Sequence, residues 1–384
     1  MLSTFISLAL VLGVRASANV HVPALTGPHK VGTTVLELID SSRQDPFAPT
    51  PQPRDLVVSL FYPTNLESSG YRTNCTLAHQ FSPGAAAGFD AELNATGVVE
   101  SIITRSCLDA PLSRPDLPLV FLDHGLGTTR LIHSDMAEEL ASYGWNVVTV
   151  DHPYDSTIIE YPDGRLVIAS ESPNVGNATL EDFLYVRVKD IRFILDSLAD
   201  PSITSRIPGM GGNSNSYKTS PTKFRTDKVG VYGHSAGGTT ALQLLHDDKR
   251  FQVGANLDGQ VFGSVLHEGV DSPFVFIGRP DHNSKTDETW TEALKNVRGF
   301  KREYTVNGTT HGSFTDLSIF RDLLGPNFLT PLIGDLGPIK GARILSIETA
   351  FMGALFDRFL KGKGGRLLDG KGLDRWPEVA LLQQ

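Results

Sequence analysis

One serine in the sequence lies in a setting that suits nucleophilic catalysis. The stretch "VGVYGHSAGGTTALQLL", residues 229–245, contains the pattern Gly-x-Ser-x-Gly around Ser235. An apolar, β-branched run precedes this serine, and a helix-favouring run follows it. This context is typical of a nucleophile elbow, a sharp strand-to-helix turn that exposes the serine hydroxyl. The pattern therefore predicts Ser235 as the nucleophile of an acyl-transfer reaction.

A serine hydroxyl is a weak nucleophile at neutral pH, so a base must lie beside it. With this type of elbow the chain order is serine, acid, histidine, which leaves as candidates His246, His267, His282 and His311. His311 follows a strand-like run in the small-residue segment "VNGTTHGSF" and precedes the final helical segments. We predict His311 as the base, with His282 as the main alternative.

Two aspartates could serve as the acid that orients this histidine. Asp258 ends the apolar run "VGANL", and Asp281 follows the apolar run "FVFIG". A carboxylate at either strand end could hold the imidazole in the required tautomer and stabilise the imidazolium. Many serine hydrolases with this chain order use the position of Asp281, and the apolar periodicity alone does not separate the two aspartates.

The oxyanion of an acyl-transfer intermediate needs two preorganised backbone donors. The elbow supplies one, the N–H of Ala236, at the start of the predicted helix. The second is expected in "HGLG", residues 124–127, directly after an earlier apolar run. Glycines there let the backbone turn its N–H groups inward, and we predict that Leu126 is the donor.

These residues need strands and helices to bring them together. Continuous apolar runs, which suit strands buried on both faces of a parallel sheet, lie near residues 117–123, 145–151, 227–234, 253–257, 272–278 and 302–306. Helical spacing of apolar residues occurs near residues 136–143, 184–198 and 349–362, and we expect the last of these helices to close the chain. Alternating patterns near residues 30–65 predict antiparallel edge strands. The order predicts an open, mostly parallel sheet with helices on both faces and chemistry at the carboxyl ends of strands.

The composition narrows the function classes. The chain has 384 residues, of which 40% are hydrophobic and 20% charged, and a formal net charge of -9. It has no block of five or more lysines and arginines, which argues against nucleic acid and anionic membrane surfaces as partners. No His-Glu-x-x-His pattern or paired metal-ligand spacing is present, so we expect neither a metal nor an organic cofactor.

The first residues are typical of secretion. The stretch "MLSTFISLALVLGVRASANV" contains a short apolar run and an Ala-Ser-Ala site, so we expect residues 1–18 to be a cleaved signal peptide. No later run in the sequence is long and apolar enough to span a bilayer. In an oxidising compartment a lone pair of cysteines usually forms a disulfide, which we predict between Cys75 and Cys107. Four Asn-x-Ser/Thr sequons predict glycosylation at Asn74, Asn94, Asn177 and Asn307.

Taken together, the motifs resemble the platelet-activating-factor acetylhydrolase family, a secreted group of serine lipases within the α/β-hydrolases. The resemblance rests on "HGLG", "SYGWNVVTVDH", "GHSAGG", "NLDG" and "HGSF" in that order, and it covers about residues 115–320. In that family the acid follows the strand after the elbow, which favours Asp258 over Asp281. The chain departs from the family at Ala236, where a bulky residue is common, and at Gly259, where an aromatic residue is common.

The resemblance implies an α/β-hydrolase fold and a secreted serine esterase. We expect residues 19–384 to form one domain with loop insertions near 66–115 and 207–222. The expected substrate is a phospholipid with a short or oxidised sn-2 acyl chain, which implies transient contact with a lipid interface. The alternatives are a broad carboxylesterase, a cutinase-like enzyme acting on polyesters, and a hydrolase fold that binds a ligand without catalysis.

Overall fold

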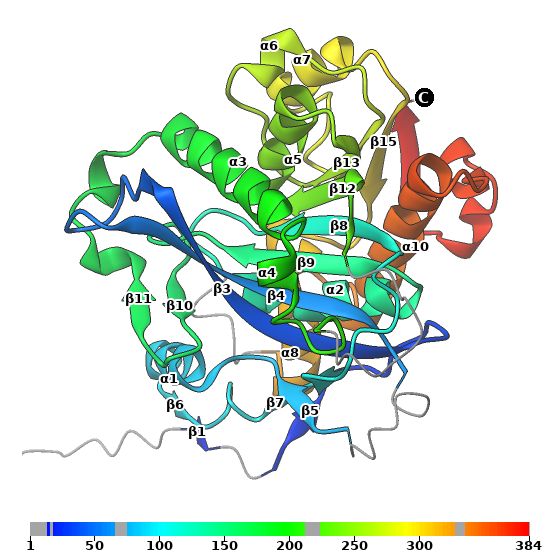
Figure 1. Ribbon diagram of the computed structural model, residues 1–384. Helices are drawn as coiled ribbons and strands as arrows, with labels where there is room; N and C mark the ends of the chain where they lie inside the picture. The colour runs from blue at the N-terminus through cyan, green and yellow to red at the C-terminus, as the bar shows by residue number, and fades with distance from the viewer. Residues whose placement is uncertain (1–13, 16–17, 66–74, 212–222, 327–334, 384) are drawn as a thin grey trace, which may run out of the picture.

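A long twisted sheet forms the centre of the protein (Figure 1). The computed structural model describes residues 14–15, 18–65, 75–211, 223–326 and 335–383. Most of the expected signal peptide, most of the 207–222 insertion and the Asn74 sequon lie outside the described residues.

Parallel strands make up the middle of this sheet. The strand order is β16 (Val379–Gln383), β15 (Lys301–Val306), β14 (Phe274–Gly278), β13 (Phe251–Leu257), β12 (Arg225–His234), β8 (Pro118–Asp123), β9 (Asn146–Asp151), β4 (Pro53–Thr64), β3 (Lys30–Gln44), β7 (Ile102–Leu108) and β2 (Val20–His21), with β5 (Leu77–His79) paired to β7. The strands from β15 to β9 are parallel, whereas β4 is antiparallel to both β9 and β3. The mostly parallel sheet with an antiparallel N-terminal hairpin is therefore confirmed.

Helices cover both faces of the sheet. The helices are α1 (Pro83–Glu92), α2 (Ser134–Ser142), α3 (Leu180–Ser197), α4 (Pro201–Thr204), α5 (Ala236–Asp247), α6 (Val265–Glu268), α7 (Glu288–Asn296), α8 (Leu317–Leu324) and α10 (Gly341–Leu360). Apolar side chains of α2, α8 and α10 pack in one core, and those of α3, α5 and α7 pack in a second core. Figure 1 shows α3 and α5 on one side of the sheet, as expected for strands that are buried on both faces.

Smaller elements complete the chain. Two short sheets pair β1 (Val14–Arg15) with β6 (Ala95–Thr96), and β10 (Ile158–Glu160) with β11 (Leu166–Ile168). The 3-10 helices are η1 (Arg130–His133), η2 (Ala169–Glu171), η3 (Val175–Asn177), η4 (His311–Phe314), η5 (Arg366–Asp369) and η6 (Leu373–Arg375). Among these elements, η1 and η4 matter most for the site, because η1 follows the HGLG loop and η4 begins with His311.

The sequence patterns predicted the buried parallel strands but missed several others, among them β16 and β7 of the main sheet. Every residue of β8 and of β9 is buried, which explains their uninterrupted apolar runs. The expectation that a helix closes the chain is wrong, because β16 follows α10 and pairs antiparallel with β15. The strand β7 lies inside the predicted 66–115 insertion and extends the main sheet by pairing with β3. The seven-residue β7 is interrupted by Thr104, Arg105 and Ser106, and β16 has only five residues, so neither was recognised as a strand.

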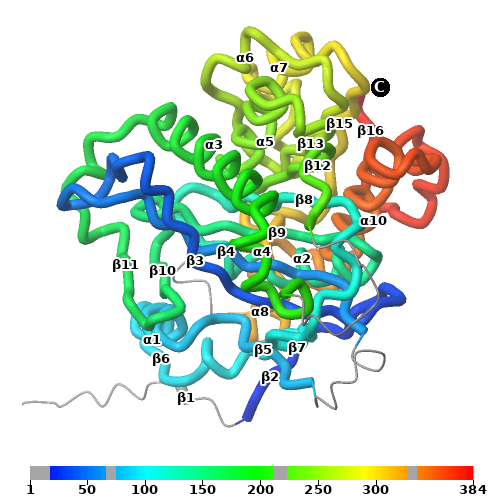
Figure 2. The backbone as a smooth tube through the Cα atoms, viewed as in Figure 1, coloured from blue at the N-terminus to red at the C-terminus, as the bar shows by residue number. Residues whose placement is uncertain are grey.

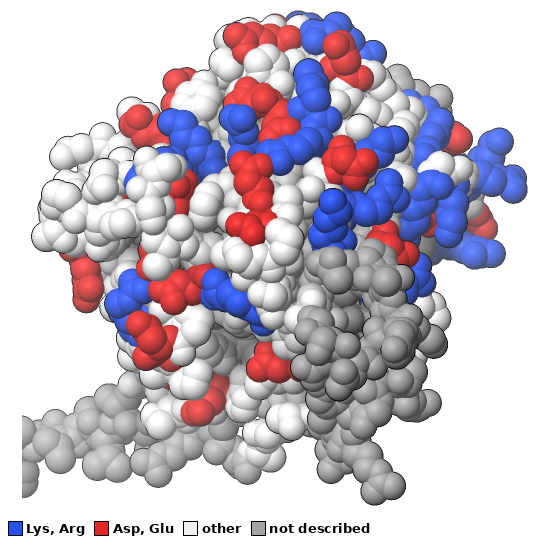
Figure 3. Space-filling model, in the orientation of Figure 1, with Lys and Arg blue, Asp and Glu red and all other residues white. Residues whose placement is uncertain are grey.

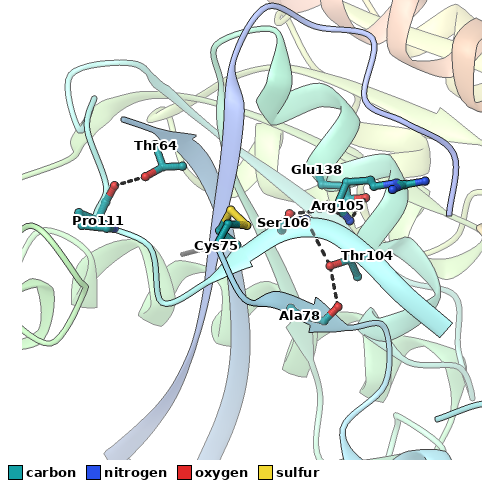
Figure 4. The surroundings of a disulfide bond; sticks show 9 residues. Thr64, Cys75, Ala78, Thr104, Arg105, Ser106, Pro111 and Glu138 are labelled. Atoms are coloured by element: carbon teal, nitrogen blue, oxygen red, sulfur yellow. Dashed lines mark hydrogen bonds between the residues drawn. A yellow bond between two sulfur atoms is a disulfide. The ribbon is translucent and has the colours of Figure 1, made fainter. Parts of the chain in front are cut away.

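The predicted disulfide is present in the 66–115 insertion. Cys75 and Cys107 are joined with their Cα atoms 5.1 Å apart and a sequence separation of 32 residues. Cys107 lies on β7, and its neighbour Ser106 donates to Glu138 Oε2 at 2.6 Å (Figure 4). The disulfide closes a loop within the insertion, and the contact of Ser106 to α2 ties the insertion to the body of the protein.

The described surface carries interspersed charges. Acidic and basic side chains lie next to one another over the upper and central part of the face in Figure 3, whereas its left side is mostly uncharged. The three described sequon asparagines, Asn94, Asn177 and Asn307, are all exposed, so each could accept a glycan without disturbing the core. Within the described part of the chain, no helix combines the length and apolar character needed to cross a bilayer.

Candidate active site

Ser235 occupies the strained turn that the Gly-x-Ser-x-Gly pattern predicts. It follows β12 directly and precedes α5, with φ 55° and ψ -123°. A side chain on Gly233 would collide with the backbone of Gly237, and one on Gly237 would collide with the backbone of Asp123. The two glycines thus allow the strand and helix to meet at a sharp angle, which leaves the Ser235 side chain partly exposed at the strand end.

The HGLG segment lies against this serine. A Cβ built on Gly125 would stand 3.1 Å from Ser235 Cβ, so the loop after β8 passes directly beside the elbow. Among the described residues, neither Leu126 nor Ala236 donates its backbone N–H to a protein acceptor. Ala236 is the first residue of α5, where an N–H has no partner within the helix. Both predicted donors are therefore available to an anion beside Ser235.

His311 is hydrogen-bonded to Asp258 at the same edge of the sheet. His311 Nδ1 lies 2.7 Å from Asp258 Oδ2, and the His311 side chain remains 47% exposed. His311 opens η4 just after β15. The ring of His234, the residue before the serine, donates from Nε2 to the His311 carbonyl at 2.9 Å. With Nδ1 occupied by the carboxylate, the Nε2 edge of His311 is left to act as a base.

Asp258 is held as a buried anion. It follows β13 with φ 56°, and its residue is only 1% exposed. Its carboxylate receives hydrogen bonds from the rings of His311 and His282, and from the backbone and guanidinium of Arg279. Burial alone would raise the pKa of Asp258, but the hydrogen bonds from His282 and His311 hold it well below its usual range.

The elbow and the acid also share backbone contacts. The Ser235 N–H donates to the carbonyl of Leu257 at 3.0 Å, one residue before Asp258. A side chain on Gly259 would collide with the Ser235 carbonyl, which explains why an aromatic residue cannot occupy this position here. The Ser235 hydroxyl makes no hydrogen bond to any described residue. Hydrogen bonds of a catalytic serine often tighten only when substrate binds.

The other candidate residues lie apart from this arrangement. Asp281 has a side chain that is 78% exposed and pairs with Arg279, not with His311. His282 is buried between two carboxylates, Asp258 and Asp287, so neither ring nitrogen is free for the serine. The remaining two histidines after the elbow, His246 and His267, lie on the exterior near α6.

A buried ionic network behind the HGLG loop was not predicted. Arg187, on α3, donates to both oxygens of Asp155, to Asp123 and to the carbonyl of His124. The backbone carbonyl of Asp155 in turn accepts a hydrogen bond from the N–H of Gly127 at 3.2 Å. Arg187 lies three residues after Leu184, on the helix face that the apolar spacing assigns to the core. A basic residue on such a face is the signal that could have revealed the network.

Three residues of this network have the spacing of a metal site. Potential ligand atoms of Asp123, His124 and His152 lie within 4.8 Å of one another, and all three residues are buried. The potential ligand atoms of Asp123 and His152 already have hydrogen-bond partners in the protein, however. Asp123 accepts from His152 Nε2 at 3.0 Å and from Arg187 at 3.1 Å. A guanidinium bonded to the only carboxylate of the set disfavours a metal cation, so these residues fit an ion-pair network rather than a metal centre.

Removing the charge of Arg187 should destabilise the protein strongly. We expect Arg187→Met to lower the free energy of unfolding by about 3–5 kcal/mol, because the carboxylates of Asp123 and Asp155 would stay buried without their cation. Denaturant unfolding followed by circular dichroism measures this loss. Arg192→Met, which changes an exposed arginine of the same helix, should cost far less. Equal losses in the two variants would contradict a structural role for the Arg187 network.

An apolar cavity opens beside the HGLG loop. It has a volume of ≈ 270 Å³, and Figure 2 shows the two helices that flank it, α1 and α8, at the same end of the molecule. The cavity is lined by aromatic and aliphatic side chains together with the backbone after Leu126, including Phe81, Phe89, Leu93, Gly127, Phe320 and Leu324. The cavity could hold an apolar part of a substrate whose carbonyl lies at Ser235.

Known proteins share this chain's sequence and fold. The model of a family described as "Platelet-activating factor acetylhydrolase, isoform II" matches residues 14–352. A probable 1-alkyl-2-acetylglycerophosphocholine esterase of Arthroderma benhamiae is 29% identical over 408 residues, which cover 97% of each chain. A platelet-activating factor acetylhydrolase of Cavia porcellus is 31% identical over 217 residues, covering 52% of this chain and 49% of that one. The structure of a ferulic acid esterase from Streptomyces cinnamoneus superposes with a TM-score of 0.79 at 29% identity, covering 95% of this chain and 100% of that one.

Proposed function

Because the chain belongs to the isoform II family of platelet-activating factor acetylhydrolases and is thus a carboxylic ester hydrolase, we propose that it cleaves the short or oxidised sn-2 acyl ester of phospholipids. The observation that carries the catalytic assignment is the 2.7 Å hydrogen bond between His311 and the buried Asp258, at the strand edge that also holds the Ser235 elbow. A hydrolase fold retained only for ligand binding would not need this arrangement.

The proposed reaction uses an acyl-enzyme. His311 Nε2 takes the proton of the Ser235 hydroxyl as its oxygen attacks the ester carbonyl. The N–H groups of Leu126 and Ala236 stabilise the oxyanion, and Asp258 holds His311 and stabilises its imidazolium. His311 then protonates the leaving alcohol. Water, activated by the same histidine, hydrolyses the acyl-enzyme and restores Ser235.

The apolar cavity supports an ester with a hydrocarbon part. Its walls come from the 66–115 insertion and from α8, and Phe81 packs edge-on against Phe320 with ring centroids 5.7 Å apart. We assign this cavity to the acyl chain, since it adjoins Gly127, directly after the oxyanion donor Leu126. A volume near the lower end of small-molecule pockets suits a short chain better than a full fatty acyl chain.

The biological setting is part of the same proposal. We infer cleavage of residues 1–18, secretion, glycosylation at exposed sequons, and transient contact with a lipid interface during catalysis. Residues 19–384 would act as one catalytic domain. The disulfide between Cys75 and Cys107 supports passage through an oxidising compartment.

A broad carboxylesterase is the second candidate. The ferulic acid esterase, which matches over 95% of this chain, favours it, because that enzyme is named for a different ester. A cutinase-like activity on polyesters belongs to the same alternative. These candidates share the chemistry at Ser235 and differ in the group that the cavity and the surface around it accept.

Substrate profiling should separate these candidates. We expect efficient hydrolysis of 1-alkyl-2-acetylglycerophosphocholine, and a matched series of p-nitrophenyl esters should show a preference for short acyl chains. In Leu93→Trp, whose new ring would fill the cavity, the ratio of kcat/KM for the hexanoyl ester to that for the acetyl ester should fall by about tenfold or more.

Two results would contradict the substrate assignment. Negligible turnover of the phospholipid with rapid turnover of simple or feruloyl esters would favour the broad esterase. An unchanged acyl-length profile in Leu93→Trp would remove the acyl chain from the cavity.

A further inference from the structure

A second histidine contacts the carboxylate of Asp258. His282 Nδ1 lies 2.9 Å from Asp258 Oδ1, and His282 Nε2 lies 2.7 Å from Asp287 Oδ2. The residue is 7% exposed, and its ring packs on Trp290 with centroids 4.6 Å apart. His282 has no role in the steps described above, yet it is hydrogen-bonded to the proposed acid just as His311 is.

The two partners of His282 determine its charge. An ionised carboxylate only accepts hydrogen bonds, so a ring that bonds carboxylates through both nitrogens must carry a proton on each. Burial lowers the pKa of His282, but the hydrogen bonds and charges of Asp258 and Asp287 outweigh burial and raise it above its ordinary value. His282 is therefore an imidazolium between two anions.

Asp287 is fixed by the start of a helix. It is the N-cap of α7, where its Oδ1 accepts from the N–H and the hydroxyl of Thr289 at 2.8 and 2.7 Å. Trp290, in the same turn, donates from Nε1 to the carbonyl of Gly259 at 2.6 Å. His282 thus links the acid to a helix end whose own side chains are held in place.

The two oxygens of Asp258 have different partners. Oδ1 accepts from His282 and from the backbone N–H of Arg279, at 2.9 and 3.0 Å. Oδ2 accepts from His311 and from the Arg279 guanidinium, at 2.7 Å each. The contacts to Oδ1 prevent rotation of the carboxylate, so that Oδ2 stays directed at His311.

We propose that His282 is a positioning residue of the catalytic triad, a protonated ring that joins Asp287 to Asp258 and keeps the Asp258 carboxylate directed at His311. This inference rests on the proposed function, because it needs Asp258 and His311 as acid and base. It adds to that function a second, cationic histidine behind the acid.

The charge of His282 should also affect the pH dependence of activity. Asp258 and Asp287 face the His282 ring, and Arg279 faces the carboxylate of Asp258. Arg279 also pairs with Asp281. Part of the negative charge of Asp258 is offset by the charge of His282. Without His282, the carboxylate beside the catalytic base would act with its full negative charge, so the acid limb of the activity profile would move to higher pH.

His282→Gln tests this role, because glutamine can still donate to Asp258 but carries no charge. We expect kcat/KM for p-nitrophenyl acetate to fall about tenfold to hundredfold. The acid limb of the profile should move up by about one pH unit. The rate of labelling of Ser235 by a fluorophosphonate probe should show the same displacement. Asp287→Asn removes a negative charge but leaves the His282 ring bonded to Asp258, so the limb should move in the opposite direction, to lower pH. This opposite displacement keeps the test available if His282→Gln does not fold.

Trp290→Phe is the matched control, since it removes a hydrogen bond beside His282 but leaves every charge in place. It should lower the melting temperature without moving the acid limb. If His282→Gln and Asp287→Asn lose activity while the limb stays in place, the role of His282 is structural and the proposal is overturned. Unchanged rates and profiles in both variants overturn it equally. Failure of the wild-type protein to be labelled at Ser235 would instead contradict the proposed function.

Discussion

Replacing Ser235 with alanine is expected to remove ester hydrolysis almost completely, with a fall in kcat of about six orders of magnitude. The loss is this large because the acyl-enzyme cannot form without the hydroxyl, and the residual rate would come only from the oxyanion donors and substrate binding. The change removes one oxygen from a partly exposed side chain, and alanine keeps the backbone of the turn. The melting temperature should therefore stay close to that of the wild type.

A fluorophosphonate probe measures the nucleophile directly, independent of the substrate. The wild-type protein should be labelled on Ser235, and Ser235→Ala should not be labelled at all. Ser205→Ala, which alters an exposed serine at the end of α4, should be labelled like the wild type. Labelling that persists in Ser235→Ala would place the nucleophile elsewhere. A wild-type protein that resists the probe would support the non-catalytic alternative.

The candidate residues could be proposed from the sequence because each belongs to a local pattern at a strand end. Ser235 lies between glycines that the sharp turn requires, and the HGLG loop and Asp258 each follow a continuous apolar run. Parallel strands bring their carboxyl ends to one edge, so short sequence segments predicted a shared site. The family resemblance was needed to favour Asp258, since two strand ends offered an aspartate.

The supporting residues could not be predicted in the same way. Arg187 meets Asp123 across 64 positions of sequence, and His282 meets Asp258 across 24. These contacts depend on how α3 packs behind the HGLG loop and how the chain after β14 folds back, and neither follows from a local pattern. His282 was weighed as a base because it follows a strand end, whereas its position between two carboxylates became evident only from the fold.

Asp258→Asn should have the second-largest effect, a fall in kcat of about four orders of magnitude. An asparagine amide cannot reproduce a carboxylate that accepts from four donors, and it would favour the wrong tautomer of His311. Steady-state kinetics on a short-chain ester measures the loss, and circular dichroism shows whether the variant folds. Labelling of Ser235 by the fluorophosphonate probe should also be strongly slowed, because His311 would no longer be oriented as a base.

Asp281→Asn is the control that decides between the two acids of the sequence. The Asp281 side chain is 78% exposed and pairs with Arg279 at 2.9 Å, so its loss removes a surface ion pair worth at most about 1 kcal/mol. Arg279 would keep its 2.7 Å contact to Asp258, and kcat should remain within about twofold of the wild type. A large loss in Asp281→Asn together with an active Asp258→Asn would reassign the acid to Asp281. That outcome would require the loop after β14 to rearrange on substrate binding, because His311 is bonded to Asp258 in the structure.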